Sequence, residues 1–134
     1  MAAGPFDWSQ YLALAEELGA RRDAAALRSS ISRAYYYVYH LALTRAEGNS
    51  YKPERGESTH VQLWRMFSGS PDPSCKRLAL IGERLKEKRE RADYNNLYAR
   101  IAEEVPSLLQ DARDFAALLA GVPRRLPSPT SIRR

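Results

Sequence analysis

The chain has 134 residues, of which 44% are hydrophobic and 28% charged, with a formal net charge of +5 and a single cysteine. This length and composition indicate one soluble folded domain and exclude global disorder. One cysteine excludes an internal disulfide and a multi-cysteine zinc site, and no uncharged stretch approaches the roughly 20 apolar residues of a membrane span. The first residues lack the basic and apolar regions of a signal peptide, so we expect a cytoplasmic protein that does not contact a membrane.

Helix-forming residues dominate the chain, and apolar residues spaced by three and four predict five helices. In chain order, we expect helices at residues 7–19, 22–47, 59–67, 74–93 and 98–120. Gly19 is a typical helix stop, and Pro106 leaves a later start for the last helix open because proline is tolerated in a first turn. Short connections between long amphipathic helices predict an all-α fold, an antiparallel up-and-down bundle of four to five helices.

We expect the bundle to comprise residues 1–121, followed by a tail at residues 122–134. The tail is rich in proline and serine and contains four arginines and no acidic residue, so we expect it to be disordered. Such a tail either binds RNA or an acidic partner through non-specific charge or serves only as a solubilising terminus. Because most of the net charge lies in this tail, the charge alone does not identify a nucleic-acid-binding protein.

A polar stripe on the predicted second helix carries the candidate functional residues. At about 100° per residue, the stripe and its border contain Ser29, Arg33, Tyr36, Tyr37, His40 and Thr44. An imidazole at His40 can transfer a proton to or from a hydroxyl, and Arg33 can hold a phosphate in two hydrogen bonds. The alternative is structural: His40 hydrogen-bonds within a helix interface, and Arg33 pairs with an acid on a neighbouring helix.

The end of the predicted fourth helix holds a second group of polar residues. Arg89 and Asp93 are four residues apart, and Tyr94 follows. They either cap this helix end locally or form a second polar cluster that faces the stripe. His60 lies near a helix start, where the dipole favours its neutral form. Two histidines without further ligands do not form a zinc site, so we expect no metal or other cofactor.

Three segments of the sequence resemble the HEPN family (higher eukaryotes and prokaryotes nucleotide-binding). They are SRAYYYVYH at residues 32–40, THVQLWRMF at residues 59–67 and RERADYNN at residues 89–96. Their order and spacing are similar to small prokaryotic members, which are often encoded beside a minimal nucleotidyltransferase. The resemblance implies a helical bundle that forms a homodimer, with the polar cluster near the dimer interface. Many members are metal-independent RNases, often toxins or antiviral effectors, that use an Arg-x(4–6)-His motif.

Two functions therefore fit the sequence. The first is a module that binds RNA, a nucleotide or a nucleotidyltransferase partner within a toxin–antitoxin or defence system. The second is a metal-independent RNase in which His40 is the acid or base and Arg33 clamps the phosphate. We expect Tyr37 and Thr44 to orient these two residues. Arg89, Asp93 and Tyr94 would then support them from the neighbouring helix. The late helix, where the family's Arg-x(4–6)-His motif normally lies, contains no histidine, which favours the binding module.

Overall fold

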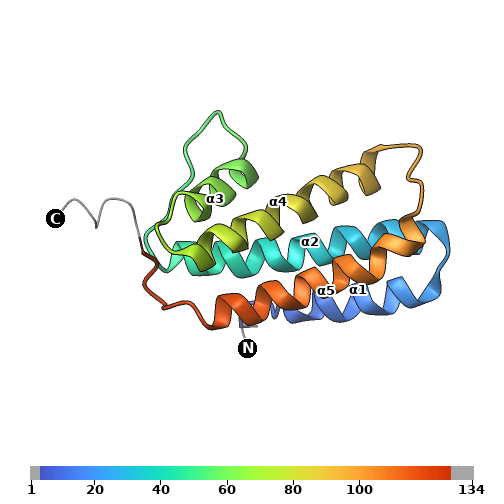
Figure 1. The fold of residues 1–134 in the computed structure, drawn as a ribbon, viewed down its shortest axis with the longest axis horizontal. Coiled ribbons are helices and arrows are strands. Elements are labelled where there is room, and N and C mark those ends of the chain that lie inside the picture. The colour runs from blue at the N-terminus through green and yellow to red at the C-terminus, as the bar shows by residue number, and fades with distance from the viewer. Residues whose placement is uncertain (1–3, 128–134) are drawn as a thin grey trace.

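The computed structural model describes residues 4–127, and its regular structure is entirely helical, which confirms the predicted all-α bundle. The helices are α1 (Ser9–Arg21), α2 (Ala24–Glu47), α3 (Thr59–Ser68), α4 (Pro73–Tyr94) and α5 (Ile101–Ala120). The four long helices lie side by side with alternating direction, and the short α3 packs at one end (Figure 1). Among residues 4–127, no helix has both the length and the apolar character needed to cross a membrane.

The second helix, α2, lies at the centre of the bundle and contacts every other helix. The predicted core positions Leu27, Ile31, Ala34 and Val38 are all buried. Leu41 is only half-buried, whereas Tyr35, outside the predicted core, is fully buried. Because neighbours surround α2 on several sides, its buried surface is wider than the single stripe that an amphipathic surface helix shows.

The first helix does not end at Gly19, as the sequence suggested, but continues to Arg21 and ends where Arg22 adopts a left-handed φ of 69°. Gly19 instead allows close packing between helices. A Cβ at this position would lie 3.1 Å from Val105 and 3.2 Å from Leu109 of α5. The missing side chain therefore lets α1 and α5 approach each other, a constraint that the sequence pattern alone does not reveal.

The fifth helix begins at Ile101, so a start at Pro106 is wrong, and the proline lies inside the helix. Side-chain contacts stabilise the turn before the proline. The Tyr98 hydroxyl donates to Glu104 at 2.9 Å, and Lys88 of α4 forms an ion pair with the same carboxylate at 2.8 Å. These contacts fix the first turn of α5, where helical hydrogen bonding is incomplete.

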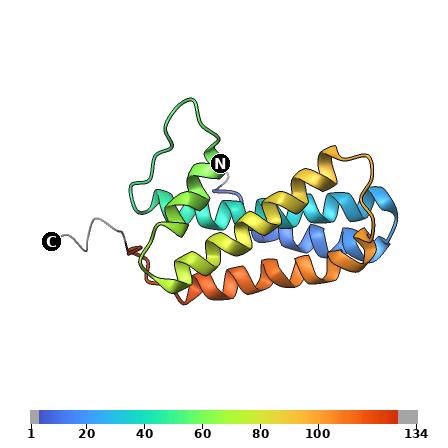
Figure 2. The ribbon, with the colours of Figure 1, turned by 45° about the horizontal axis from the view of Figure 1, so that its top comes forward.

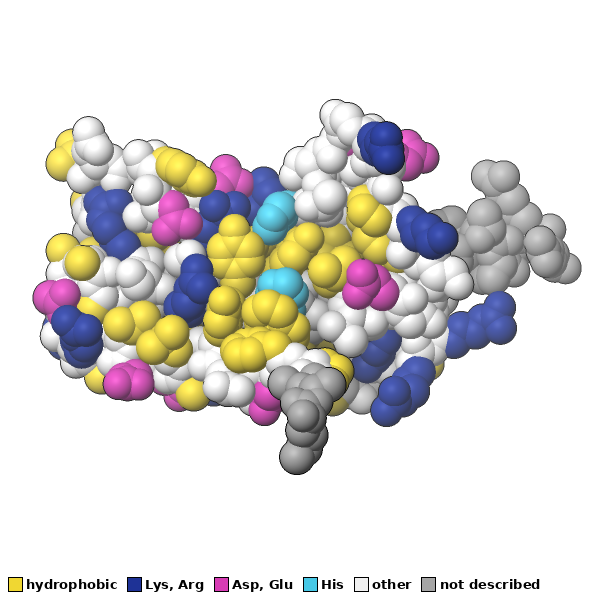
Figure 3. Space-filling view, turned by 180° about the vertical axis from the view of Figure 1, so that it is seen from behind, with side chains coloured by type: hydrophobic (Ala, Val, Ile, Leu, Met, Phe, Trp, Pro, Cys, Tyr) yellow, Lys and Arg dark blue, Asp and Glu magenta, His cyan; other side chains and the backbone are white. Residues whose placement is uncertain are grey.

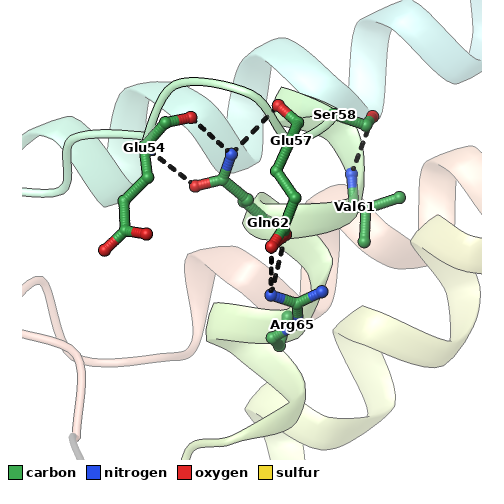
Figure 4. Close-up of polar contacts among 6 residues, drawn as sticks. All are labelled: Glu54, Glu57, Ser58, Val61, Gln62 and Arg65. Atoms are coloured by element: carbon green, nitrogen blue, oxygen red, sulfur yellow. Dashed lines mark hydrogen bonds and ion pairs between the residues drawn. The ribbon is translucent and has the colours of Figure 1, made fainter.

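The loop at residues 48–58 projects beside α3 and is held to it by side-chain hydrogen bonds (Figures 2 and 4). The Gln62 amide bonds the backbone N–H and carbonyl of Glu54 at 2.7 and 2.9 Å and the carbonyl of Glu57 at 3.1 Å. Ser58 caps α3 through its hydroxyl. These contacts fix the beginning of α3, which carries one of the two histidines of the chain.

Residues 122–127 return across the end of the bundle. Arg45 donates to the carbonyls of Leu119 and Val122 at 3.3 and 3.1 Å, so it bridges α2 and the end of α5. The Asn49 side chain bonds the carbonyl of Arg124 at 2.9 Å and the N–H of Leu126 at 2.8 Å. These contacts hold residues 122–127, which the sequence assigned to the tail, against the end of the bundle. Residues 128–134 lie outside the described part of the chain.

Candidate functional site

Both histidines reach the surface on one face of the bundle, among apolar side chains and beside Lys or Arg (Figure 3). Trp8 and tyrosines of α2 contact the histidine rings directly. Residues of α1 and α4 contact these aromatic residues in turn. We call this group the histidine face, and it consists of Trp8, Tyr11, Ser32, Arg33, Tyr35, Tyr36, Tyr39, His40, His60, Arg89 and Asp93. Residues far apart in the sequence thus form one connected group, in which Ser32, Tyr35, Tyr39 and Arg89 are buried and the others are at least partly exposed.

The imidazole of His40 lies flat against the indole of Trp8, with ring centroids 3.4 Å apart and planes inclined by 4°. Trp8 immediately precedes α1 and packs edge-on against Tyr11. Burial lowers the pKa of His40 from its ordinary value, although Glu47 opposes this effect. The ring nitrogens of His40 form no hydrogen bond with a described residue, and the ring is half-buried. His40 therefore retains both nitrogens for a ligand.

Arg33 lies about two helical turns before His40 on α2 and packs against aromatic rings. Its guanidinium lies 4.7 Å from the ring centroid of Tyr11 and 5.5 Å from that of Tyr36. One nitrogen donates to the Ser32 hydroxyl at 3.4 Å. Arg33 forms no ion pair with any residue in the range 4–127, so the predicted alternative of a structural ion pair is not observed there. The half-buried guanidinium keeps its charge available.

Arg89 and Asp93 of α4 face the polar stripe of α2. Arg89 is only 9% exposed, and its guanidinium lies 5.4 Å from the ring centroid of Tyr36. Its one ion pair in the described structure is with Asp93, at 3.6 Å, and its buried Nε has no hydrogen-bond partner there. Asp93 also accepts a hydrogen bond from Ser32 at 3.4 Å. The two polar groups identified in the sequence therefore meet, through Ser32 and around Tyr36.

His60 is the functional candidate that the sequence analysis did not select. It forms a 2.6 Å hydrogen bond with the Tyr35 hydroxyl and stacks on the Tyr39 ring at 4.2 Å. Burial lowers the pKa of His60, and the charges of Arg89 and Lys86 lower it further. The position of His60 near a helix start predicted the same direction, and burial is the largest of the causes found in the structure. Its place in the segment THVQLWRMF, which resembles a family motif, was the available signal.

Tyr37 and Thr44 do not lie on the histidine face, although a helical projection placed them near Arg33 and His40. They line a separate pocket of about 610 Å³ between the N-terminal segment, α2 and residues near the end of α5. Trp8 also lines this pocket while it stacks on His40. The chain before α1 therefore separates residues that a single-helix projection groups together.

Ser29 and Tyr94, the two remaining candidates, are both exposed. Tyr94 is 76% exposed at the end of α4, and Ser29 lies in the exposed first part of α2. Within the described residues, neither side chain has a hydrogen bond or ion pair with the histidine face. Their predicted role in ligand binding therefore has no structural support beyond exposure.

The described residues contain no group of three or more His, Cys, Asp or Glu side chains that could hold a metal ion. Comparisons of the chain with family models, curated proteins and solved structures find no match.

Proposed function

We propose that this chain is a HEPN-like helical module that binds RNA or a nucleotide through the histidine face. The observation that carries the proposal is the pair of guanidiniums at Arg33 and Arg89, both of which lie against Tyr36. Asp93 is the one carboxylate within ion-pair distance of either guanidinium in residues 4–127, at 3.6 Å from Arg89. The two positive charges are thus incompletely balanced, which favours an anionic ligand.

The residue types of this face suit a nucleotide better than a simple anion. Guanidinium groups bind phosphate oxygens in pairs of hydrogen bonds. Tyr36 is half-buried, so part of its side chain is available for stacking with a base. Single-stranded RNA offers phosphates and unstacked bases together, which makes it the ligand class that uses both features.

The test is the binding of a labelled single-stranded oligoribonucleotide, measured by fluorescence anisotropy at several salt concentrations. We expect Arg33→Gln and Arg89→Lys to weaken binding about tenfold. Arg33→Gln removes a positive charge and should also lower the slope of log affinity against log salt by about 0.7, whereas Arg89→Lys keeps its charge and should leave this slope unchanged. Arg77→Gln is the matched control, because Arg77 lies in a groove between α4 and α5. Equal weakening by all three variants, or no binding by the wild type, would contradict the proposal.

The tail requires its own control, because its arginines can bind RNA without specificity. Replacement of Arg133 and Arg134 by Gln removes two tail charges outside the described residues. We expect this variant to retain the dependence of binding on Arg33. If binding disappears in the tail variant, the tail and not the histidine face holds the RNA.

Metal-independent RNA cleavage is the second candidate function, favoured by the two unbonded ring nitrogens of His40. In this reaction His40 takes the proton of a 2′-hydroxyl, whose oxygen attacks phosphorus while the bond to the 5′ oxygen breaks. The leaving 5′ oxygen takes up a proton from water, and His40 returns its proton to solvent. The products are a 2′,3′-cyclic phosphate and a 5′-hydroxyl, and Arg33 stabilises the added negative charge. Incubation of RNA with wild type, His40→Gln and Arg33→Gln in chelator tests this. RNA that stays intact with the wild type contradicts it.

The motif resemblance also supports a homodimer, a nucleotidyltransferase-type antitoxin partner and a place in a toxin–antitoxin or defence system. Light scattering during size-exclusion chromatography measures the oligomeric state. Co-purification with a nucleotidyltransferase encoded next to this chain tests the partner. A monomer that retains no such partner would leave RNA or nucleotide binding as the whole function.

A further inference from the structure

The hydroxyl of Tyr35 lies between two ring nitrogens inside the bundle. The Trp64 Nε1 donates to it at 3.1 Å, and His60 Nδ1 lies 2.6 Å away. An indole N–H can only donate, so the Tyr35 oxygen accepts that bond. Tyr35 is fully buried, and His60 Nδ1 is the acceptor available for its proton among the described residues. The Tyr35 hydroxyl therefore donates to His60.

This direction determines which nitrogen of His60 carries a proton. Nδ1 accepts the hydrogen bond with its lone pair, so the neutral ring has its proton on Nε2. Nε2 has no hydrogen bond with a described residue and is accessible to solvent. The histidine side chains are visible at the surface of this face (Figure 3). An N–H donor therefore reaches solvent on the histidine face, close enough to Arg89 for its charge to lower the pKa of His60.

The surroundings of His60 also disfavour its protonated form. Protonation of the ring at Nδ1 would place an N–H against the Tyr35 hydroxyl. The Tyr35 oxygen would then accept hydrogen bonds from both Trp64 and His60, and its own proton would lose its acceptor. The charged and titratable groups that face His60 are Tyr35, Tyr36, Tyr39 and His40 of α2 and Lys86, Arg89 and Glu90 of α4. Only Glu90 favours a cation, and it is outweighed by burial and by the two positive side chains.

We propose that His60 is a neutral hydrogen-bond donor of the ligand site, held in its Nε2–H form by Tyr35, and that it binds a phosphate oxygen or base acceptor of the RNA. This inference rests on the proposed function. The two histidines then have different roles in the site. His60 cannot take a proton from the ligand, because Nε2 already carries one and Nδ1 faces Tyr35. His40 is then the imidazole with a nitrogen free to act as a base.

The tautomer can be measured without any ligand, by NMR of the full chain with ¹⁵N-labelled histidine. We expect Nδ1 of His60 to be unprotonated and Nε2 protonated between pH 6.5 and about 8, where the neutral ring dominates. Tyr35→Phe removes the donor and shifts the ring towards a mixture of tautomers. Tyr39→Phe is the matched control, because its ring stacks on His60 while its hydroxyl contacts Thr59. A proton on Nδ1 in the wild type would overturn the inference.

The contribution to binding is measured with the same oligoribonucleotide. His60→Leu should weaken binding about tenfold, because one hydrogen bond to a charged acceptor contributes about that factor to the affinity. His60→Gln keeps an N–H donor near the position of Nε2 and should stay within about threefold of the wild type. The loss in His60→Leu should be the same at pH 6.5 and pH 8, because the donor is neutral.

Three outcomes separate the two proposals. Equal affinity of wild type and His60→Leu, with binding that still depends on Arg33, would overturn the role of His60 alone. A loss that appears only towards acidic pH would show that His60 binds as a cation, which also overturns it. If the wild type binds no RNA at all, the proposed function and the ligand contact fail together, and the NMR measurement still decides the tautomer.

Discussion

The indole of Trp64 in α3 packs directly on the backbone of Gly82 in α4, so closely that a Cβ at residue 82 would lie 2.4 Å from the ring. This contact allows the two helices to approach each other and buries Trp64 almost completely. It also holds the indole N–H against the Tyr35 hydroxyl, and through Tyr35 it affects His60. A single missing side chain thus helps to position a residue of the histidine face.

Gly82→Ala should therefore destabilise the protein. Alanine normally gains about 0.5–1 kcal/mol over glycine within a helix, but here the added methyl forces Trp64 to move. We expect a net loss of about 1–3 kcal/mol, typical of an overpacked core, in urea denaturation followed by tryptophan fluorescence. Gly121→Ala is the control, because its Cβ would meet its nearest neighbour, the Leu118 carbonyl, at 3.5 Å. Equal effects at both positions would contradict the packing argument.

Trp8→Ala should raise the pKa of His40 towards its ordinary value near 6.5. Burial is the main cause of the lowered pKa, and the stacked indole covers one face of the imidazole. NMR titration of the His40 ring proton measures the shift. Phe6→Ala serves as the control, because Phe6 packs edge-on against Trp8 and Tyr11 and makes no ring contact with His40. An unchanged His40 pKa in Trp8→Ala would show that other groups bury the ring.

The stability of the protein should fall as the pH decreases from 6.5 to 5. Both histidines have a lower pKa in the folded chain than in the unfolded chain, so the unfolded state binds more protons in this window. The stabilisation that the two neutral histidines contribute is complete above pH 6.5, near the pKa of histidine in the unfolded chain. It is lost as the pH falls towards the lower pKa values of His40 and His60 in the folded chain. Urea denaturation at pH 7.5, 6.5, 5.75 and 5 measures this loss.

The double variant His40→Gln, His60→Gln is the control for the pH experiment. We expect its free energy of unfolding to change less than that of the wild type between pH 6.5 and 5, because most carboxylates titrate at lower pH. If the variant and the wild type lose stability in parallel, groups other than the two histidines are responsible.

Arg45→Ala should release residues 122–127 from the end of the bundle. Arg45 donates to the carbonyls of Leu119 and Val122, and a hydrogen bond from a charged donor contributes about 1.5–3 kcal/mol. We expect trypsin to cleave after Arg124 and Arg125 several-fold faster than in the wild type, as followed by mass spectrometry.

The matched control for this experiment is Arg21→Ala, which removes an exposed arginine whose ion pair is local to the beginning of α2. Its cleavage rate after Arg124 should equal that of the wild type. If Arg45→Ala also leaves the rate unchanged, the Asn49 contacts hold this segment without Arg45.

The sequence alone determined the helical architecture and placed most of the helix bounds within two residues. Apolar residues spaced by three and four define helices locally, so this information lies within short segments. The structure adds the caps Asp23 and Asp72, which the sequence analysis did not identify. The sequence also selected Arg33, Tyr36, His40, Arg89 and Asp93, which the fold brings to one face. Their selection came from residue chemistry and from the spacing of motifs.

Only the tertiary structure decided how these residues are grouped. A helical projection describes one helix in isolation, so it could not show that Trp8 covers His40 or that Tyr37 and Thr44 line a different pocket. The importance of His60 depends on Tyr35, which is 25 residues away in sequence. A hydrogen bond between helices depends on how they pack, and that packing depends on contacts such as Trp64 against Gly82. Local sequence patterns do not encode such contacts, because they arise from the shapes of surfaces that meet only after folding.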